Sequence, residues 1–190
     1  MDFNGEFKKL NEIYNNEGVI RDASLDFTSR KFFAEFKHRI RVERHAEVAF
    51  AVERKNGKII VIRTNFYPAG IYRIPTGGIN FGEDVVSALN REIAEELGVK
   101  IEVKRFLGAV KYHINYKDEK LNFYSFVFWL KELSGEILAD AIEDEICEFI
   151  EVDHAELVAI CNNLNSNTSR WKDWCSFRVQ TTQFILDYIQ

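Results

Sequence analysis

Three glutamates lie close together in the stretch between Gly77 and Val99, namely Glu92, Glu95 and Glu96. The stretch has the periodicity of an amphipathic helix, on which each residue advances by about 100°, so the three carboxylates share one face. Crowded carboxylates repel one another at neutral pH, and a proton, an arginine or a divalent cation relieves that repulsion. Mg²⁺ and Mn²⁺ prefer hard oxygen ligands and commonly bridge them to substrate phosphates. The carboxylates alone leave two interpretations open, a metal site and a solvated acidic face.

The residues around this helix favour the metal site. Gly77, Gly78 and Gly82 precede the helix, and a glycine-rich loop lets the backbone approach a phosphate closely. Arg91 lies four residues before Glu95, where it can orient the carboxylates and partly neutralise them. The sequence therefore predicts a phosphate-binding loop that leads into an acidic helix.

The spacing of these residues resembles the Nudix box, the signature of the Nudix hydrolase family. Every defined position of that signature is matched, by Gly77, Glu83, Arg91, Glu92, Ile93, Glu95, Glu96, Gly98 and Val99. The box is short, and outside it the resemblance extends only to the order of the strands. The resemblance implies an α/β/α sandwich and the hydrolysis of a nucleoside diphosphate linked to another group. It also implies that water attacks a phosphorus atom with the help of Mg²⁺ or Mn²⁺.

The resemblance also implies a role for each residue of the box. Glu95 and Glu96 are expected to bind the metal, and Glu92 to be either a further ligand or the base that activates water. Glu83 and Arg91 are expected to form a structural pair that holds the preceding loop on the helix.

Two further metal ligands are suggested by family members. The backbone carbonyl of Thr76 stands where they often offer an oxygen, although glycine is commoner there. They also often bring a carboxylate from a loop before the last core strand, and spacing favours Glu143 within AIEDEICEF. An ordinary acidic surface loop explains that segment at least as well. Gly98 is expected to end the helix with a left-handed conformation.

The remainder of the sequence says less about the substrate. The candidate binding residues are Arg63, Arg73, Gly77, Gly78, Phe81 and Tyr116. Arginine suits paired hydrogen bonds to phosphate, and an aromatic ring suits stacking on a base. Tyr116 stands where diadenosine polyphosphate hydrolases tend to have a tyrosine. The plainer alternatives are surface ion pairs for the arginines and packing for the aromatic residues. ADP-ribose hydrolases tend to carry a proline after the box, and no proline follows Pro75 here.

The hydrophobic pattern predicts the elements that position these residues. Strands are expected over 47–52, 58–64, 72–74, 99–116, 121–133 and 146–152, with a hairpin turn at Asn56-Gly57. Helices are expected over 85–97, from 153 to about 163, and from 168 or 169 onward. This mixture favours an α+β or layered α/β/α fold.

The chain of 190 residues is long enough for one main domain. We expect an N-terminal extension of unsettled secondary structure over 1–44, a Nudix hydrolase domain over 45–164, and a C-terminal helix packed on it over 165–190. The net charge of −5 makes nucleic acid and membrane surfaces poor partners. The three cysteines are widely spaced and include no Cys-x-x-Cys pair, and no long apolar run is present, so we expect a soluble, cytoplasmic protein. The sequence leaves open whether the protein forms a homodimer.

The leading hypothesis is a Mg²⁺- or Mn²⁺-dependent pyrophosphohydrolase of a small nucleotide derivative. Nucleotide sugars, ADP-ribose-like compounds, dinucleoside polyphosphates and nucleoside triphosphates all remain candidates. One alternative is a sensor that binds a nucleotide without hydrolysing it, although such proteins usually lose carboxylates of the box. Another is an RNA 5′-end pyrophosphohydrolase, suggested by the basic residues Arg30, Lys31, Lys37, Arg39, Arg41 and Arg44. A solvated helix face explains those charges better.

Overall fold

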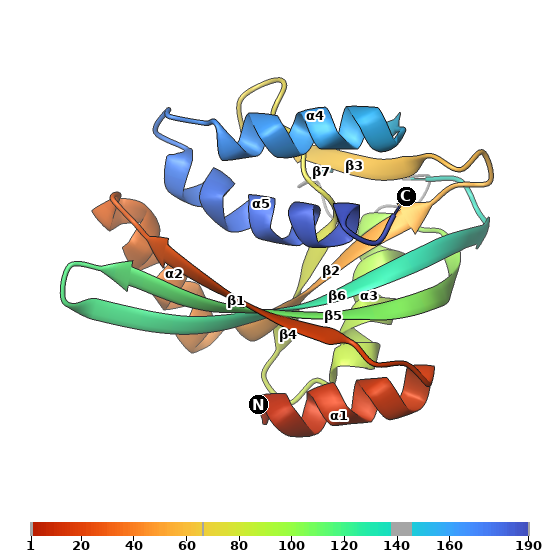
Figure 1. The fold of residues 1–190 in the computed structure, drawn as a ribbon, viewed down its shortest axis with the longest axis horizontal. Coiled ribbons are helices and arrows are strands. Elements are labelled where there is room, and N and C mark those ends of the chain that lie inside the picture. Colours follow the sequence, from red (N-terminus) through yellow and green to blue (C-terminus); the bar gives the residue numbers. More distant parts are fainter. Residues whose placement is uncertain (1, 66, 138–145, 190) are drawn as a thin grey trace.

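A mixed β-sheet lies between two layers of helices in the computed structural model of the chain, which describes residues 2–65, 67–137 and 146–189 (Figure 1). Within these residues the strands run in the order β1, β5, β6, β2, β3 and β7, and β4 pairs with β2. In chain order the elements are α1 (Phe3–Tyr14), β1 (Val19–Asp26), α2 (Arg30–Val42), β2 (Arg44–Glu53), β3 (Ile59–Thr64), β4 (Thr76–Asn80), α3 (Val85–Glu96), β5 (Lys100–Tyr116), β6 (Glu119–Ser134), β7 (Ile146–Val152), α4 (His154–Asn165) and α5 (Lys172–Leu186). The expected α/β/α sandwich is confirmed.

Each face of the sheet carries its own hydrophobic core. Side chains alternate between the two faces along a strand, so Val48 and Phe50 of β2 join one core while Ala49 and Ala51 join the other. Helices α1 and α3 cover the first core, and α2, α4 and α5 cover the second. Because β2 is buried on both faces, its sequence is a nearly continuous apolar run. No helix among the described residues is long and apolar enough to cross a membrane.

The N-terminal segment is built into the sheet. Strand β1 runs parallel to β5, in register from Val19 opposite Gly108 to Asp26 opposite Asn115. Gly108 has a φ of 140°, and a Cβ at this position would lie 1.9 Å from the carbonyl oxygen of Val19. Only glycine therefore allows the two strands to approach this closely. The sequence left the choice between helix and strand open here, and the segment contains both.

Several expected elements are found where the sequence placed them. The box helix runs from Val85 to Glu96, and Gly98 follows it with a φ of 67° and donates its N–H to the carbonyl of Ile93. Strand β7 has the predicted bounds, and Asp153 caps α4 in a capping box with Glu156. Local signals, namely caps and hydrophobic period, were sufficient for these elements.

Other elements differ in extent. The strand expected over 72–74 is reduced to a single bridge between Ile62 and Arg73. The C-terminal helix begins at Lys172, after a short turn, and not at 168 or 169. At the β2–β3 hairpin only Gly57 has a positive φ, of 80°, and the Arg54 N–H donates to the carbonyl of Lys58. The hairpin is confirmed, but its loop is longer than the two-residue turn that the sequence suggested.

Candidate active site

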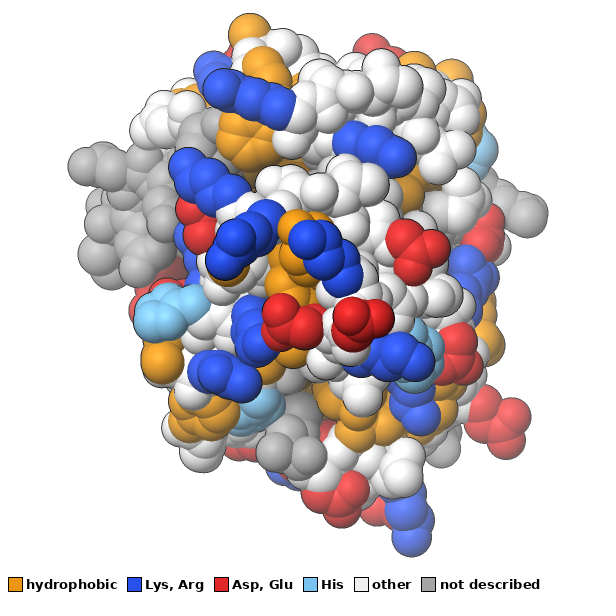
Figure 2. Space-filling view, turned by 90° about the vertical axis from the view of Figure 1, so that its left-hand side faces the viewer, with side chains coloured by type: hydrophobic (Ala, Val, Ile, Leu, Met, Phe, Trp, Pro, Cys, Tyr) orange, Lys and Arg blue, Asp and Glu red, His pale blue; other side chains and the backbone are white. Residues whose placement is uncertain are grey.

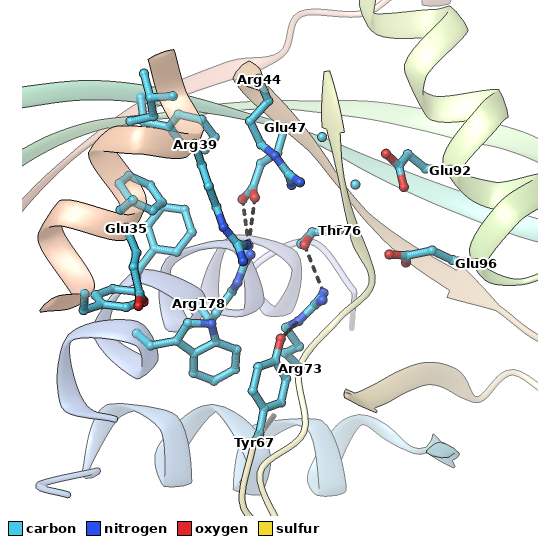
Figure 3. A pocket seen from close by; sticks show the side chains of 18 of the residues that line it. Glu35, Arg39, Arg44, Glu47, Tyr67, Arg73, Thr76, Glu92, Glu96 and Arg178 are labelled. Carbon is cyan, nitrogen blue, oxygen red and sulfur yellow. Dashed lines mark hydrogen bonds and ion pairs between the residues drawn. The ribbon is translucent and has the colours of Figure 1, made fainter. Parts of the chain in front are cut away.

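A cavity of about 720 Å³ opens between α3 on one side and α2 and α5 on the other (Figure 3). The wall on the α3 side holds most of the residues singled out in the sequence, namely Arg73, Thr76, Gly77, Gly78, Arg91, Glu92, Glu95 and Glu96. In Figure 3 the carboxylates of Glu92 and Glu96 extend from α3 toward β4. The acidic helix and the glycine-containing strand therefore form one side of a single cavity.

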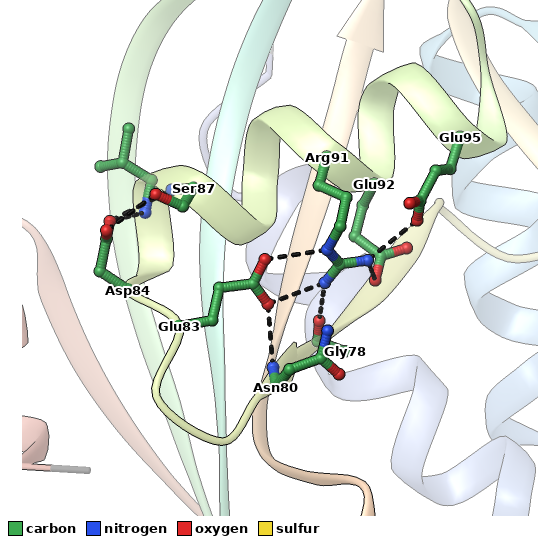
Figure 4. A network of polar contacts seen from close by, with 9 residues as sticks. Gly78, Asn80, Glu83, Asp84, Ser87, Arg91, Glu92 and Glu95 are labelled. Carbon is green, nitrogen blue, oxygen red and sulfur yellow. Dashed lines mark hydrogen bonds and ion pairs between the residues drawn. The ribbon is translucent and has the colours of Figure 1, made fainter.

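The start of α3 is fixed by its own sequence. Asp84 is the N-cap, and its carboxylate accepts hydrogen bonds from the N–H groups of Val86 and Ser87 at 3.0 and 3.1 Å (Figure 4). Leu89 and Ile93 bury the opposite face of the helix in the core. These two constraints set both the position and the rotation of α3, and so direct its glutamates toward the cavity.

We expect Asp84→Ala to lower the free energy of unfolding by about 1 kcal/mol, the usual effect of losing an N-cap. The hydrogen bond from Ser87 is the main reason that the pKa of Asp84 is lowered. A lowered pKa contributes stability that is present above the unfolded-state pKa of about 3.9 and is lost as the pH falls through the folded-state pKa. Denaturant unfolding should therefore show a smaller difference between wild type and Asp84→Ala at pH 3 than at pH 7.

Asp84→Asn is the matched control, because asparagine keeps the cap but does not titrate. Its stability relative to wild type should improve on acidification. A difference for Asp84→Ala that stays constant between pH 7 and pH 3 would contradict the assigned role.

Arg91 joins the turn before α3 to β4 (Figure 4). Its Nε donates to Glu83 at 2.8 Å, and its Nη2 donates to Glu83 at 2.9 Å and to the carbonyl of Gly78 at 2.8 Å. Glu83 also accepts the N–H of Asn80 at 3.0 Å. The bond from Arg91 is the main reason that the pKa of Glu83 is lowered. This set of contacts fixes the turn between the strand and the acidic helix.

The remaining Arg91 nitrogen holds two of the three carboxylates. Nη1 donates to Glu92 at 2.8 Å and to Glu95 at 2.9 Å. Glu92 is only 9% exposed, and burial raises its pKa, while the contact with Arg91 acts in the opposite direction. One guanidinium therefore partly neutralises the negative charge of the crowded carboxylates that the sequence indicated.

The expectation of a loop at Gly77 and Gly78 was wrong. Both residues lie in β4, where they pair antiparallel with Val48 and Glu47 of β2, and only the turn residue Gly82 has a positive φ. A Cβ at Gly77 would lie 2.0 Å from the Cγ and Cδ of Glu92. The glycine is therefore needed because the Glu92 carboxylate occupies the space that a side chain would take.

Under the hydrolysis that the resemblance to the Nudix box implies, Gly77→Ala should displace the Glu92 carboxylate and lower turnover about 100-fold, because a shift of about 1 Å at a reacting group can cost that much. The measurement is kcat at saturating metal, with circular dichroism to verify folding. Gly57→Ala is the control, since it strains a positive φ in the β2–β3 hairpin with nothing within 4 Å of the added Cβ. Equal turnover in the two variants would contradict the proposed position of Glu92.

The donor groups on this wall suit a hard divalent cation. Three carboxylates and the backbone oxygens of β4 are oxygen ligands of the type that Mg²⁺ and Mn²⁺ prefer, and Gly77 leaves the room in which Glu92 lies. Over 2–65, 67–137 and 146–189, no three His, Cys, Asp or Glu side chains are already arranged around a metal position. Arg91 Nη1 contacts Glu92 and Glu95 there, so a cation between these carboxylates would replace that nitrogen. Glu143 lies outside the described residues.

Arg73 is a buried residue of the same cavity. It is 5% exposed, and its Nε donates to the hydroxyl of Tyr67 at 2.8 Å. Its Nη1 donates to the carbonyl of Ile74 at 2.9 Å and to Oγ1 of Thr76 at 3.0 Å. These bonds hold the Ile74 carbonyl and the Thr76 side chain at the start of β4 (Figure 3).

The other candidate binding residues do not line the cavity. Arg63 forms an ion pair with Glu148 at 2.8 Å. Phe81 is 56% exposed, and its ring lies 5.2 Å from that of His45. Tyr116 stacks on Phe33 at 5.2 Å and belongs to the packing of α2 on the sheet.

The cavity also holds a buried ion pair that the sequence analysis missed. Glu47 of β2 is 2% exposed, and Nη1 of Arg178 in α5 donates to both of its carboxylate oxygens at 2.9 Å. The hydroxyl of Ser125 also donates to Glu47, at 2.6 Å. The sequence does contain a signal of this pair, namely one charged residue, Glu47, within the apolar run AEVAFAV. A charge that is buried in this way requires a partner of opposite charge. The partner itself could not be found from local sequence.

Comparison with known proteins agrees with this geometry. Residues 43–175 match the NUDIX domain family. The ADP-ribose pyrophosphatase of Methanocaldococcus jannaschii is 29% identical over 144 residues, which are 72% of this chain and 80% of that protein. Nudix hydrolase 8 of Arabidopsis thaliana is 34% identical over 88 residues, and these are 43% of this chain but only 23% of that protein. A solved structure of a UDP-X diphosphatase shares the fold, with a TM-score of 0.50, 17% identity, and coverage of 86% of this chain and 74% of that one. Because the family match extends over most of the chain and includes the whole acidic helix, this chain belongs to the Nudix hydrolase family.

Proposed function

We propose that this chain is a Mg²⁺- or Mn²⁺-dependent pyrophosphohydrolase that acts on a small nucleotide derivative. The observation that carries the proposal is that Glu92, Glu95 and Glu96 line one cavity together with arginines from the opposite side. The side of the cavity formed by Glu92, Glu95 and Glu96 suits a divalent cation, which commonly bridges carboxylates to substrate phosphates. The cationic side chains opposite it suit hydrogen-bond acceptors elsewhere on a nucleotide.

Glu92, Glu95, Glu96 and the carbonyl of Thr76 each have a part in the proposed reaction. A divalent cation, when bound, neutralises phosphate charge and lowers the pKa of a bound water. Glu95, Glu96 and the carbonyl of Thr76 would hold the cation. Glu92 would either join them or take the proton from the attacking water, and its contact with Arg91 sets its orientation.

The size of the cavity favours a small substrate over RNA. A volume of about 720 Å³ lies within the range of small-molecule sites. On the side of the molecule that carries α2, the basic side chains of the described residues lie among acidic and apolar ones (Figure 2). Lys37 of α2 is also neutralised by an ion pair with Glu119. RNA recognition requires a more continuous basic surface than this one.

The test is a substrate panel of nucleotide sugars, ADP-ribose, dinucleoside polyphosphates, nucleoside triphosphates and capped RNA, incubated with Mg²⁺ or Mn²⁺ and with EDTA. We expect metal-dependent release of a mononucleotide or of phosphate from one class of small nucleotide. Preference for capped RNA would replace the proposal with an RNA 5′-end activity. Nucleotide binding without turnover anywhere in the panel would replace it with a sensor.

A further inference from the structure

The wall opposite the acidic helix comes from parts of the chain that lie largely outside the family match. Residues 43–175 match the family, whereas α2 precedes this range and most of α5 follows it. We call this side the α2–α5 wall and define it by Phe32, Phe36, Arg39, Trp171, Phe177 and Arg178, all of which line the cavity. The acidic helix thus faces a wall that lies mostly outside the family match (Figure 3).

The two helices of this wall are fixed to each other. The carboxylate of Asp173, near the start of α5, is 3% exposed. It accepts the N–H of Thr28 at 2.9 Å, the N–H of Ser29 at 2.6 Å and the hydroxyl of Thr28 at 3.1 Å. Ser29 is the N-cap of α2. The α2–α5 wall is therefore held in place before any ligand arrives, which lowers the entropic cost of binding.

The wall presents aromatic rings to the cavity. Phe36 packs against Phe123 and Phe177, with ring centroids 5.2 and 5.0 Å apart, so its position is fixed. Phe32, Phe36 and Trp171 are each only half-buried. Partly exposed rings on a rigid support are suited to stacking on a planar ligand group.

Guanidinium groups lie beside these rings. Arg178 is held by Glu47, and its Nε has no hydrogen-bond partner in the described part of the chain. Arg39 is exposed, and its side chain makes no hydrogen bond or ion pair with the described residues. In Figure 3 it extends from α2 toward Arg178. Of these two cations, Arg178 is paired with Glu47 and Arg39 has no carboxylate partner among the described residues. The pair of guanidinium groups therefore favours a ligand group that is rich in hydrogen-bond acceptors.

We infer that the α2–α5 wall is the subsite for the nucleobase of the substrate and that Arg39 is a specificity-determining residue within it. A nucleobase combines a planar ring, which suits Phe32, Phe36 and Trp171, with ring nitrogens and carbonyls that accept hydrogen bonds from arginine. The pyrophosphate then lies toward Glu92, Glu95 and Glu96 on the opposite wall. This inference rests on the proposed function, and it assigns the orientation of the substrate in the cavity.

The test uses the fluorescence of the tryptophans in the full chain, with EDTA present so that no turnover occurs. AMP, GMP, CMP and UMP are titrated separately, and ribose 5-phosphate serves as the ligand without a base. We expect at least one nucleotide to quench the fluorescence and to bind at least tenfold more tightly than ribose 5-phosphate. Trp171→Phe should keep the affinity but lose most of the quenching, which would locate the signal.

Arg39→Ala should weaken binding of the preferred nucleotide at least tenfold, and should raise KM more than it lowers kcat for the corresponding substrate. Arg41→Ala is the matched control, because Arg41 lies on the same helix, is exposed and does not line the cavity. Equal affinity for nucleotides and ribose 5-phosphate, or equal effects of the two arginine variants, would overturn the inference.

Failure of the inference and failure of the proposed function give different results. If the substrate panel is hydrolysed but Arg39→Ala leaves both affinity and KM unchanged, the base does not bind at the α2–α5 wall, although the function stands. If nucleotides bind as expected but nothing in the panel is hydrolysed, the subsite stands and the pyrophosphohydrolase proposal fails.

Discussion

Glu96→Gln is expected to lower kcat/KM for the best substrate by about 10³-fold, which corresponds to about 4 kcal/mol of transition-state stabilisation. Glutamine has the shape of glutamate, so the fold of α3 is retained, but the side chain loses the negative charge that a divalent cation requires. The measurements are steady-state kinetics over a range of Mg²⁺ concentrations and the free Mn²⁺ signal in electron paramagnetic resonance. The variant should need much more metal for whatever activity remains.

Glu102→Gln is the matched control for this substitution. Glu102 is an exposed residue of β5, and it makes no side-chain hydrogen bond or ion pair with the described residues. Its replacement removes the same charge from the chain without touching the cavity. If Glu96→Gln and Glu102→Gln had the same activity and the same Mn²⁺ affinity, Glu96 would not be a metal ligand.

Arg178→Met is expected to have the largest effect on stability, about 3 kcal/mol in the free energy of unfolding. Removing one partner of a buried ion pair leaves the other charge without compensation, and here Glu47 would remain 2% exposed beside Ser125. Denaturant unfolding measures the effect. Lys37→Met is the control, because the Lys37–Glu119 pair is exposed to solvent and its loss should have a much smaller effect.

A double variant separates the charge from the packing. Glu47→Leu combined with Arg178→Met removes both charges, and it should be more stable than Arg178→Met alone, since no unpaired charge remains. If the double variant were instead less stable by the sum of the two single effects, the uncompensated charge would not explain the loss.

The acidic half of the site, on α3, could be predicted from the sequence because its determinants are local. The N-cap at Asp84, the apolar stripe through Leu89 and Ile93 and the cap at Gly98 all lie within the box helix or next to it. A fixed helical period then placed three carboxylates on one face without reference to the rest of the chain. The positions of the central strands along the chain followed in the same way from hydrophobic composition and turn signals.

The opposite half could not be predicted, because it is made by contacts between distant parts of the chain. Asp173 and Thr28 are 145 residues apart in the sequence, and Glu47 and Arg178 are 131 residues apart. No periodicity or turn rule connects such residues. The basic character of α2 was visible in the sequence, but that its Arg39 lies in the cavity became clear only from the packing of α2 against α5.

The glycines before the acidic helix show why one prediction was wrong. Gly77 and Gly78 were assigned to a phosphate-binding loop, because a glycine-rich segment before a helix lets the backbone approach a phosphate closely. Their place in β4 follows from pairing with β2, and the lack of a side chain at Gly77 is required by Glu92, which lies 15 residues later on α3. Close approach of a backbone to another group is the other common reason for glycine within a strand.

The most direct test of the central claim is hydrolysis of the preferred substrate in ¹⁸O-labelled water with Mg²⁺, followed by ³¹P nuclear magnetic resonance and mass spectrometry of the products. Attack of water on phosphorus predicts one solvent oxygen in a single phosphate-containing product, with cleavage abolished by EDTA and strongly reduced in Glu96→Gln. Label found in a product without phosphorus, or cleavage that persists unchanged in EDTA and in Glu96→Gln, would contradict the account.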